Sequence, residues 1–159
     1  MLGVGMAGLL HFLPADPVYR KDNLAITAEL ANPVTAEIRD AVRNGYVFRG
    51  EYAFSLIVND RKSYEASRVN RLSRDSVWRV NGAPVPEDSL GSRMGAAAAD
   101  FPRLRFDAGD RILVFIKAKI PDDSAFTAST ALPAAILWNY YVPRTRTEWE
   151  FRAGGFRAR

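Results

Sequence analysis

The sequence predicts an α+β fold in which a mostly antiparallel curved sheet or β-sandwich carries two or three short helices. Three observations predict it. Segments that alternate apolar and polar residues recur along the chain, amphipathic stretches at helical spacing lie between them, and no internal repeat or heptad is present. A chain of 159 residues, 48% hydrophobic and 25% charged, has the composition of one globular domain.

The first elements are predicted to be two strands on either side of a short helix. Residues 24–30 alternate in the manner of a half-buried strand, and residues 34–42 carry apolar side chains at helical spacing. Asn44-Gly45 supplies a left-handed stop for this helix. A long strand follows over 46–58, in which Gly50 indicates a bulge or a bend.

The middle of the chain is predicted to form an edge strand, a short strand and a helix. Segment 61–72 is polar on both faces, and its basic residues would discourage edge-to-edge association. Residues 77–80 form a short strand before the turn at Asn81-Gly82. A helix is expected over 87–101, because Ala96 to Ala99 have the highest intrinsic helix propensity.

The last elements are predicted to be two strands separated by an uncharged stretch. Strand 111–120 is apolar on one face and partly apolar on the other, which places it near the centre of a sheet. Pro133 is expected to open a short helix. Residues 145–151 alternate cleanly and place Trp149 in the core.

The chain divides into a leader, a domain and a tail. Residues 1–23 are expected to be an apolar leader and tether, 24–153 a single globular domain, and 154–159 a frayed tail. Met1 to Pro14 carries no formal charge and resembles the apolar region of an export signal, with a candidate cleavage region at Pro14-Ala15-Asp16. A clipped signal or anchor is the favoured interpretation, and packing on the domain is the alternative. We therefore expect an exported protein, periplasmic or membrane-tethered.

The residue inventory excludes several classes of site. The chain has no cysteine and one histidine, His11, which excludes Cys/His zinc sites, thiol nucleophiles and disulfides. Acidic pairs at Asp107/Asp110 and Asp122/Asp123 flank a strand that holds them roughly 30 Å apart, so they cannot share one cation. We expect no enzyme, no metal and no cofactor, although an undetected hydrolase is a third hypothesis.

The first candidate binding surface combines aromatic and basic residues near the C-terminus: Trp138, Tyr140, Tyr141, Arg144 and Arg146. Such a cluster suits an apolar groove, a protein partner or a membrane interface. Burial of the aromatic side chains in the core is the alternative interpretation.

The second candidate surface is the basic segment 61–79, which holds six basic and two acidic residues. Arg68, Arg71, Arg74 and Arg79 alternate there with polar and aromatic residues, a pattern that single-stranded nucleic acid can use. No recognition-helix, zinc-finger or RNP1-like pattern accompanies them. A solvated edge strand explains the same residues.

The chain is similar to the bacterial domain-of-unknown-function family 4390, over about residues 24–151. Segment 61–76 departs from it, being more polar and irregular than the strand-like family pattern. The resemblance implies an exported or membrane-tethered envelope protein and carries no catalytic residues. The matching stretches are Leu24 to Leu30, Val34 to Gly45, Phe48 to Val58, Leu72 to Arg74, Trp78 to Val80 and Thr147 to Trp149.

The leading functional hypothesis is a non-enzymatic envelope-associated domain that binds a protein partner or an apolar ligand, with its oligomeric state left open. The alternative is a cytoplasmic nucleic-acid-binding domain that uses the basic segment 61–79.

Overall fold

The computed structural model describes residues 10–13, 15–121 and 143–159 of the chain. The described elements, in chain order, are β1 (His11–Phe12), β2 (Val18–Arg20), β3 (Asn23–Ala31), α2 (Ala36–Arg43), β4 (Phe48–Val58), β5 (Lys62–Arg74), β6 (Trp78–Val80), β7 (Ala83–Pro84), the 3₁₀ turn η1 (Glu87–Ser89), α3 (Leu90–Gly95), β8 (Ala96–Phe101), β9 (Arg111–Lys119), β10 (Arg144–Arg152) and β11 (Gly155–Ala158).

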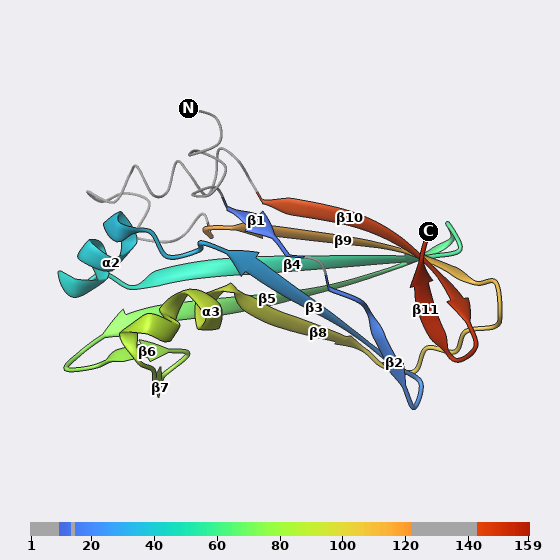
Figure 1. Ribbon diagram of the computed structural model, residues 1–159, viewed down its shortest axis with the longest axis horizontal. Helices are drawn as coiled ribbons and strands as arrows, with labels where there is room; N and C mark the ends of the chain where they lie inside the picture. Colours follow the sequence, from blue (N-terminus) through green and yellow to red (C-terminus); the bar gives the residue numbers. More distant parts are fainter. Residues whose placement is uncertain (1–9, 14, 122–142) are drawn as a thin grey trace.

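Two antiparallel sheets make up the molecule. The larger sheet has seven strands in the order β11-β10-β9-β4-β5-β6-β7, and in the smaller sheet β3 pairs with β1, β2 and β8. The smaller sheet crosses the larger one obliquely, while α2 and α3 lie together at one end (Figure 1). The predicted fold class, a mostly antiparallel α+β fold with short helices, is therefore correct.

The core lies between the two sheets because each contributes one apolar face. Alternate residues of β3, from Leu24 to Leu30, are buried against the larger sheet. The largest fully buried side chains there are those of Tyr52, Phe48 and Phe54 on β4. The predicted strands 24–30, 46–58, 111–120 and 145–151 all exist, and Trp149 is buried as expected. No bulge interrupts β4, whose pairing with β5 runs continuously from Phe48 to Val58 through Gly50.

Helix α2 forms where its sequence predicts it. The Thr35 hydroxyl accepts a hydrogen bond from the Ile38 backbone N–H at 3.3 Å and caps the first turn. Its apolar stripe is buried, and Gly45, at φ +100°, provides the left-handed residue that ends the helix.

The helix predicted over 87–101 is wrong in its second half. Helix α3 ends at Gly95, and the four alanines begin strand β8, which pairs with β3 from Glu29 to Leu24. Alanine has the highest helix propensity, but propensity is a weak preference that pairing and burial override. Strand β8 buries Ala99 and Phe101 in the core, and a helix continued from α3 would give up this pairing with β3.

Three further segments are more ordered than expected. The edge strand expected over 61–72 is present and longer than expected: it is the 13-residue strand β5, which pairs with β4 and only at its end with β6. The tail 154–159 contains β11, which folds back on β10. Within the predicted leader, β1 and β2 both pair with β3 and Leu10 is buried, so the domain begins before residue 24. A cut at Ala15 would separate β1 from the domain.

A buried polar network joins β5 to the start of β8. The Asn70 side-chain amide donates to the Met94 and Ala96 carbonyl oxygens at 3.0 and 2.8 Å, and its oxygen accepts from Asn81 at 3.0 Å. Buried polar groups are stable only when their hydrogen bonds are made, and this network makes them. It therefore fixes the α3–β8 junction against the larger sheet.

Candidate functional site

The candidate site is the face of the larger sheet that points away from the smaller one. Strands β5, β4, β9 and β10 lie side by side, and every second residue of each strand points to this outer face. Their registers set the outward residues in rows across the sheet. The rows are Val69, Glu51 and Lys119; then Ser67, Ala53, Lys117 and Arg144; then Glu65, Ser55, Phe115 and Arg146; then Ser63, Ile57, Leu113 and Glu148.

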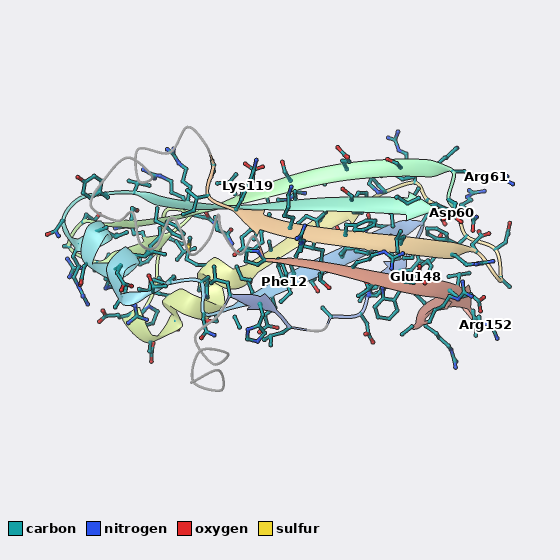
Figure 2. The ribbon with its side chains drawn as sticks, turned by 90° about the horizontal axis from the view of Figure 1, so that it is seen from above. Phe12, Asp60, Arg61, Lys119, Glu148 and Arg152 are labelled. Carbon is teal, nitrogen blue, oxygen red and sulfur yellow. The ribbon has the colours of Figure 1, made fainter. Side chains whose placement is uncertain are left out.

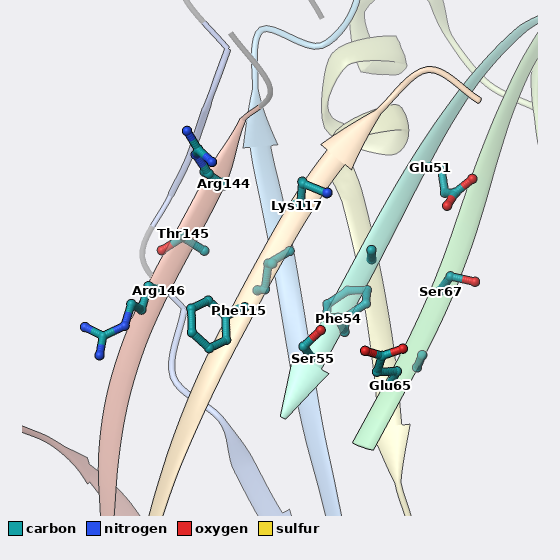
Figure 3. Close-up of a pocket in the computed structure, with 13 residues that line it drawn as sticks. Glu51, Phe54, Ser55, Glu65, Ser67, Phe115, Lys117, Arg144, Thr145 and Arg146 are labelled. Atoms are coloured by element: carbon teal, nitrogen blue, oxygen red, sulfur yellow. The ribbon is translucent and has the colours of Figure 1, made fainter. Parts of the chain in front are cut away.

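The two middle rows form a shallow trough of about 930 Å³. Its floor consists of small side chains on β4 and β5, among them Ala53, Ser55 and Ser67, while the Phe115 ring stands on the β9 side. Figure 3 shows these residues together with the charged groups on either side. A hollow of this size is within the range of pockets that bind ligands in proteins.

The trough has one acidic side and one basic side. Glu51 and Glu65 lie on β4 and β5, whereas Lys117, Arg144 and Arg146 lie on β9 and β10 (Figure 3). Antiparallel pairing places Lys117 directly opposite Arg144, so two cations stand together in one row. Two cations held side by side attract an anionic group of a ligand.

Arg146 is held in place by its neighbours. Its guanidinium pairs with Glu148 at 3.2 Å and lies 5.9 Å from the centre of the Phe115 ring. This arrangement orients the cation over an aromatic face, where such contacts contribute about 0.5–1 kcal/mol at exposed sites. No ion pair joins Lys117, Arg144, Glu51 or Glu65 to another part of the chain that the structure describes.

Of the first set of predicted site residues, Arg144 and Arg146 line the trough. Trp138, Tyr140 and Tyr141 lie outside the described residues, as do Asp122, Asp123 and the helix expected from Pro133. Lys117, Phe115, Glu51 and Glu65 were not predicted as site residues. Alternation puts each of them on a polar strand face, but only the strand order brings the four strands together.

The second set of predicted site residues is divided between the two faces of the sheet. On β5, Arg68 and Arg74 point to one face and Arg71 to the other. The Arg74 guanidinium lies 5.5 Å from the Trp78 ring, and Arg79 pairs with Asp75 at 3.0 Å. The Val77 backbone N–H and the Arg79 side chain lower the pKa of Asp75, which keeps this pair charged.

The turn before β9 and a smaller cavity are further features of the described residues. Asp110 accepts a hydrogen bond from the Asp107 backbone N–H at 2.7 Å and one from the Asn59 amide at 3.1 Å, so it stabilises the turn before β9. Within the described ranges, no group of three or more His, Cys, Asp or Glu residues is arranged to hold a metal ion. A second cavity, of about 170 Å³, lies between the sheets and is lined partly by Phe12, Ile26 and Trp149. It is below the roughly 300 Å³ of typical ligand pockets, so the trough is the better site.

Comparisons with protein families, with curated proteins and with solved structures give no match. In the part of the chain that the structure describes, no helix is long and apolar enough to cross a membrane.

Proposed function

We propose that this chain is a non-enzymatic, envelope-associated interaction domain that binds a protein partner in the outer-face trough. The observation that carries the proposal is the juxtaposition of Phe115 with three cations, Lys117, Arg144 and Arg146, around a floor of small side chains. Aromatic and arginine side chains contribute most of the energy at protein interfaces, and small neighbours leave room for the partner's side chains.

The charges of the trough favour a polypeptide over a simple anion or a lipid chain. A simple anion would use the basic side and leave Glu51 and Glu65 facing it across the floor. An apolar chain would desolvate all five charged groups, which is costly without partners. A protein surface can present acidic and basic side chains at matching positions, so it satisfies both sides of the trough.

Binding suits the trough better than catalysis. The hydroxyl groups that line the trough belong to Ser55, Ser67 and Thr145, and among the described residues no hydrogen bond joins any of these hydroxyls to a general base. A serine nucleophile needs such a base within hydrogen-bond reach.

The envelope address rests on the apolar leader and on a resemblance to the domain-of-unknown-function family 4390, for which the comparison with protein families gives no match. Both remain predictions. The pairing of β1 with β3 shows that the end of the predicted leader packs on the domain.

Site-specific photo-crosslinking in the source organism tests the proposal. A photoreactive phenylalanine analogue replaces Ser55 in the trough or, as the matched control, Thr27, which is exposed on the outer face of the smaller sheet. We expect a discrete protein adduct from position 55, in the envelope fraction, and none from position 27. Reversal of the basic side with Lys117→Glu and Arg144→Glu should abolish it. Absence of any adduct at position 55, or an identical adduct at both positions, contradicts the proposal.

A further inference from the structure

The outward rows of the trough are complementary to themselves. We infer that the protein partner is a second copy of this chain, bound face to face about a two-fold axis that runs parallel to β4 and β9 and passes between them. The inference rests on the proposed function, because it names the partner of the same surface. A two-fold axis in this place sets β4 over the second copy's β9, and β5 over its β10, with each row facing its own copy.

The charges match under this operation. Glu65 and Arg146 are the two ends of one row, so Glu65 of one copy faces Arg146 of the other. Glu51 and Lys119 are paired across β4 and β9, so each Glu51 faces a Lys119. Symmetry doubles both contacts, which gives four oppositely charged pairs across the interface.

The side-chain sizes in the same rows are complementary as well. Apart from Glu51 and Glu65, the outward side chains on the β4 and β5 half of the trough are small, whereas the β9 and β10 half carries long ones. The two-fold therefore lays Lys117 over Ala53, Arg144 over Ser67 and Phe115 over Ser55. Two concave surfaces would normally leave a void between them, but here the large half of each copy fills the small half of the other.

The next row adds an apolar contact. Ile57 and Leu113 are both half-buried on this face and lie opposite one another on β4 and β9. The two-fold places Ile57 of one copy over Leu113 of the other. Aligned stacking of two sheets about 10 Å apart, with their strands within about 30° of parallel, is a common packing of twisted sheets.

The charge pattern also selects the direction of the axis. An in-plane two-fold perpendicular to the strands would set β5 over β5 and β10 over β10. It would then bring acidic side against acidic side and basic against basic, which is unfavourable. Of these two axes, the one parallel to the strands brings opposite charges together.

The size of the face predicts a weak dimer. Strand β4 has 11 residues, which span about 37 Å, and four strands cover roughly 15–19 Å. The footprint is on the order of 600 Å² for each copy, below the roughly 800 Å² of a standard interface. Dissociation in the micromolar range is therefore expected, and added salt should weaken the dimer because its ion pairs are close to solvent.

A charge-swap series followed by sedimentation equilibrium at about 0.1 M salt tests the inference. Glu65→Arg and Arg146→Glu should each weaken dimerisation at least tenfold, because each sets like charges face to face. The double variant should recover dimerisation to within a few-fold of wild type. Within one copy, positions 65 and 146 lie three strand spacings apart, roughly 14 Å, beyond the Debye length of about 10 Å at 0.1 M salt. Recovery of dimerisation in the double variant would therefore come from a charge pair between the two copies. Glu29→Arg, an exposed charge reversal on the smaller sheet, is the matched control and should leave the dimer unchanged.

A chemical crosslink gives a second measurement. Because the chain has no cysteine, Ser55→Cys introduces a single thiol close to the axis. The two copies of this residue would lie about 11 Å apart, within reach of a short bismaleimide. We expect a covalent dimer from Ser55→Cys and none from Thr27→Cys. The inference is wrong if the wild type is monomeric at several hundred micromolar. It is also wrong if the double variant dimerises as weakly as the single variants. The proposed interaction function would still stand if photo-crosslinking from position 55 gave an adduct with a different protein.

Discussion

Gly95, at the junction of α3 and β8, occupies a position where no side chain fits. A Cβ atom added there would lie 2.2 Å from the Leu30 carbonyl oxygen, which belongs to the backbone of β3. Close approach of one backbone to another is a common reason for glycine in a structure. Gly91, in the same helix, has open space at the corresponding point.

The two glycines give a matched pair of variants. Gly95→Ala should lower the free energy of unfolding by about 3 kcal/mol, because the β3 and β8 backbones must move apart. Gly91→Ala should raise it by about 0.5–1 kcal/mol through the entropy of the unfolded chain. Urea unfolding at pH 7 measures both. Equal effects of the two substitutions on the free energy of unfolding would show that the close approach to Leu30 does not limit the side chain at position 95.

Tyr52 is a titratable side chain that is fully buried in the core. Burial raises the pKa of its hydroxyl well above the usual value of about 10, and the hydroxyl donates to the Met94 carbonyl oxygen at 2.5 Å. The folded state thus keeps a proton that the unfolded chain loses above pH 10. Its contribution to stability is complete below pH 10 and is lost as the pH rises further.

Tyr52→Phe should therefore change how stability depends on pH. At pH 7 we expect a loss of about 1–2 kcal/mol, because the hydrogen bond is gone while Asn70 still donates to Met94. Above pH 10 the free energy of unfolding of the wild type should fall more steeply than that of the variant, by about 1.4 kcal/mol per pH unit. Urea unfolding between pH 8 and 11 measures the difference. Tyr46→Phe, at an exposed tyrosine, should retain the wild-type slope, and parallel curves for wild type and Tyr52→Phe would exclude this titration.

At the scale of elements, the strands were more predictable than the segments between them. Alternation in β3, β4, β9 and β10 reports one buried and one solvated face, so sequence alone located these strands. Strand β8 escaped prediction because four alanines have no alternation and favour a helix. Its pairing with β3 is a contact between residues about 70 positions apart, which local sequence does not encode.

Strand β1 is a short element whose contribution can be measured. The Phe12 ring packs edge-on to Tyr52, with the ring centres 6.5 Å apart, whereas Leu13 is 39% exposed. Phe12→Ala should cost about 2 kcal/mol of stability and Leu13→Ala less than about 0.5 kcal/mol. Thermal and urea unfolding of the full chain compare the two. A negligible effect of Phe12→Ala would mean that β1 contributes little to the domain.

At the scale of the whole molecule, β2 and β11 lie at the end of the sandwich opposite the helices (Figure 1). An aromatic cluster closes this end. Tyr19 of β2, Phe106 of the loop before β9, Phe151 of β10 and Phe156 of β11 pack around one another. The Tyr19 hydroxyl also donates to the Leu104 carbonyl oxygen at 2.6 Å. Figure 2 shows how Arg152 and Glu148 of β10 lie toward this end, with Asp60 and Arg61 of the β4–β5 turn nearby.

Loss of one ring should loosen this end selectively. The Phe156 ring centre lies 4.9 Å from that of Phe106 and 5.2 Å from that of Phe151, so Phe156→Ala removes one ring contact from each of them. We expect about 2–3 kcal/mol of destabilisation, with faster amide hydrogen exchange in β2 and β11 than in β4 and β9. Val18→Ala, at a side chain that is 53% exposed, is the control. Uniform loss of protection across both sheets would contradict a local role.

The candidate site could be predicted only in part. Arg144 and Arg146 stood out because a basic pair follows an aromatic run, and Lys117 stood on a solvated strand face. The acidic side could not be foreseen, since Glu51 and Glu65 face the trough only because β4 lies between β5 and β9. Likewise the basic segment 61–79 is one patch in sequence, but strand alternation sends its arginines to both faces of the sheet.

By itself the sequence determined the fold class, the principal strands, helix α2 and the buried position of Trp149, because alternation, capping and turn residues act over a few positions. Tertiary structure decided the order of the strands, the conversion of the alanine run into β8, the pairing of β1 and β11, and the assembly of the trough. The physical reason is that these features depend on pairing between distant strands, whose hydrogen bonds and buried area outweigh local preference.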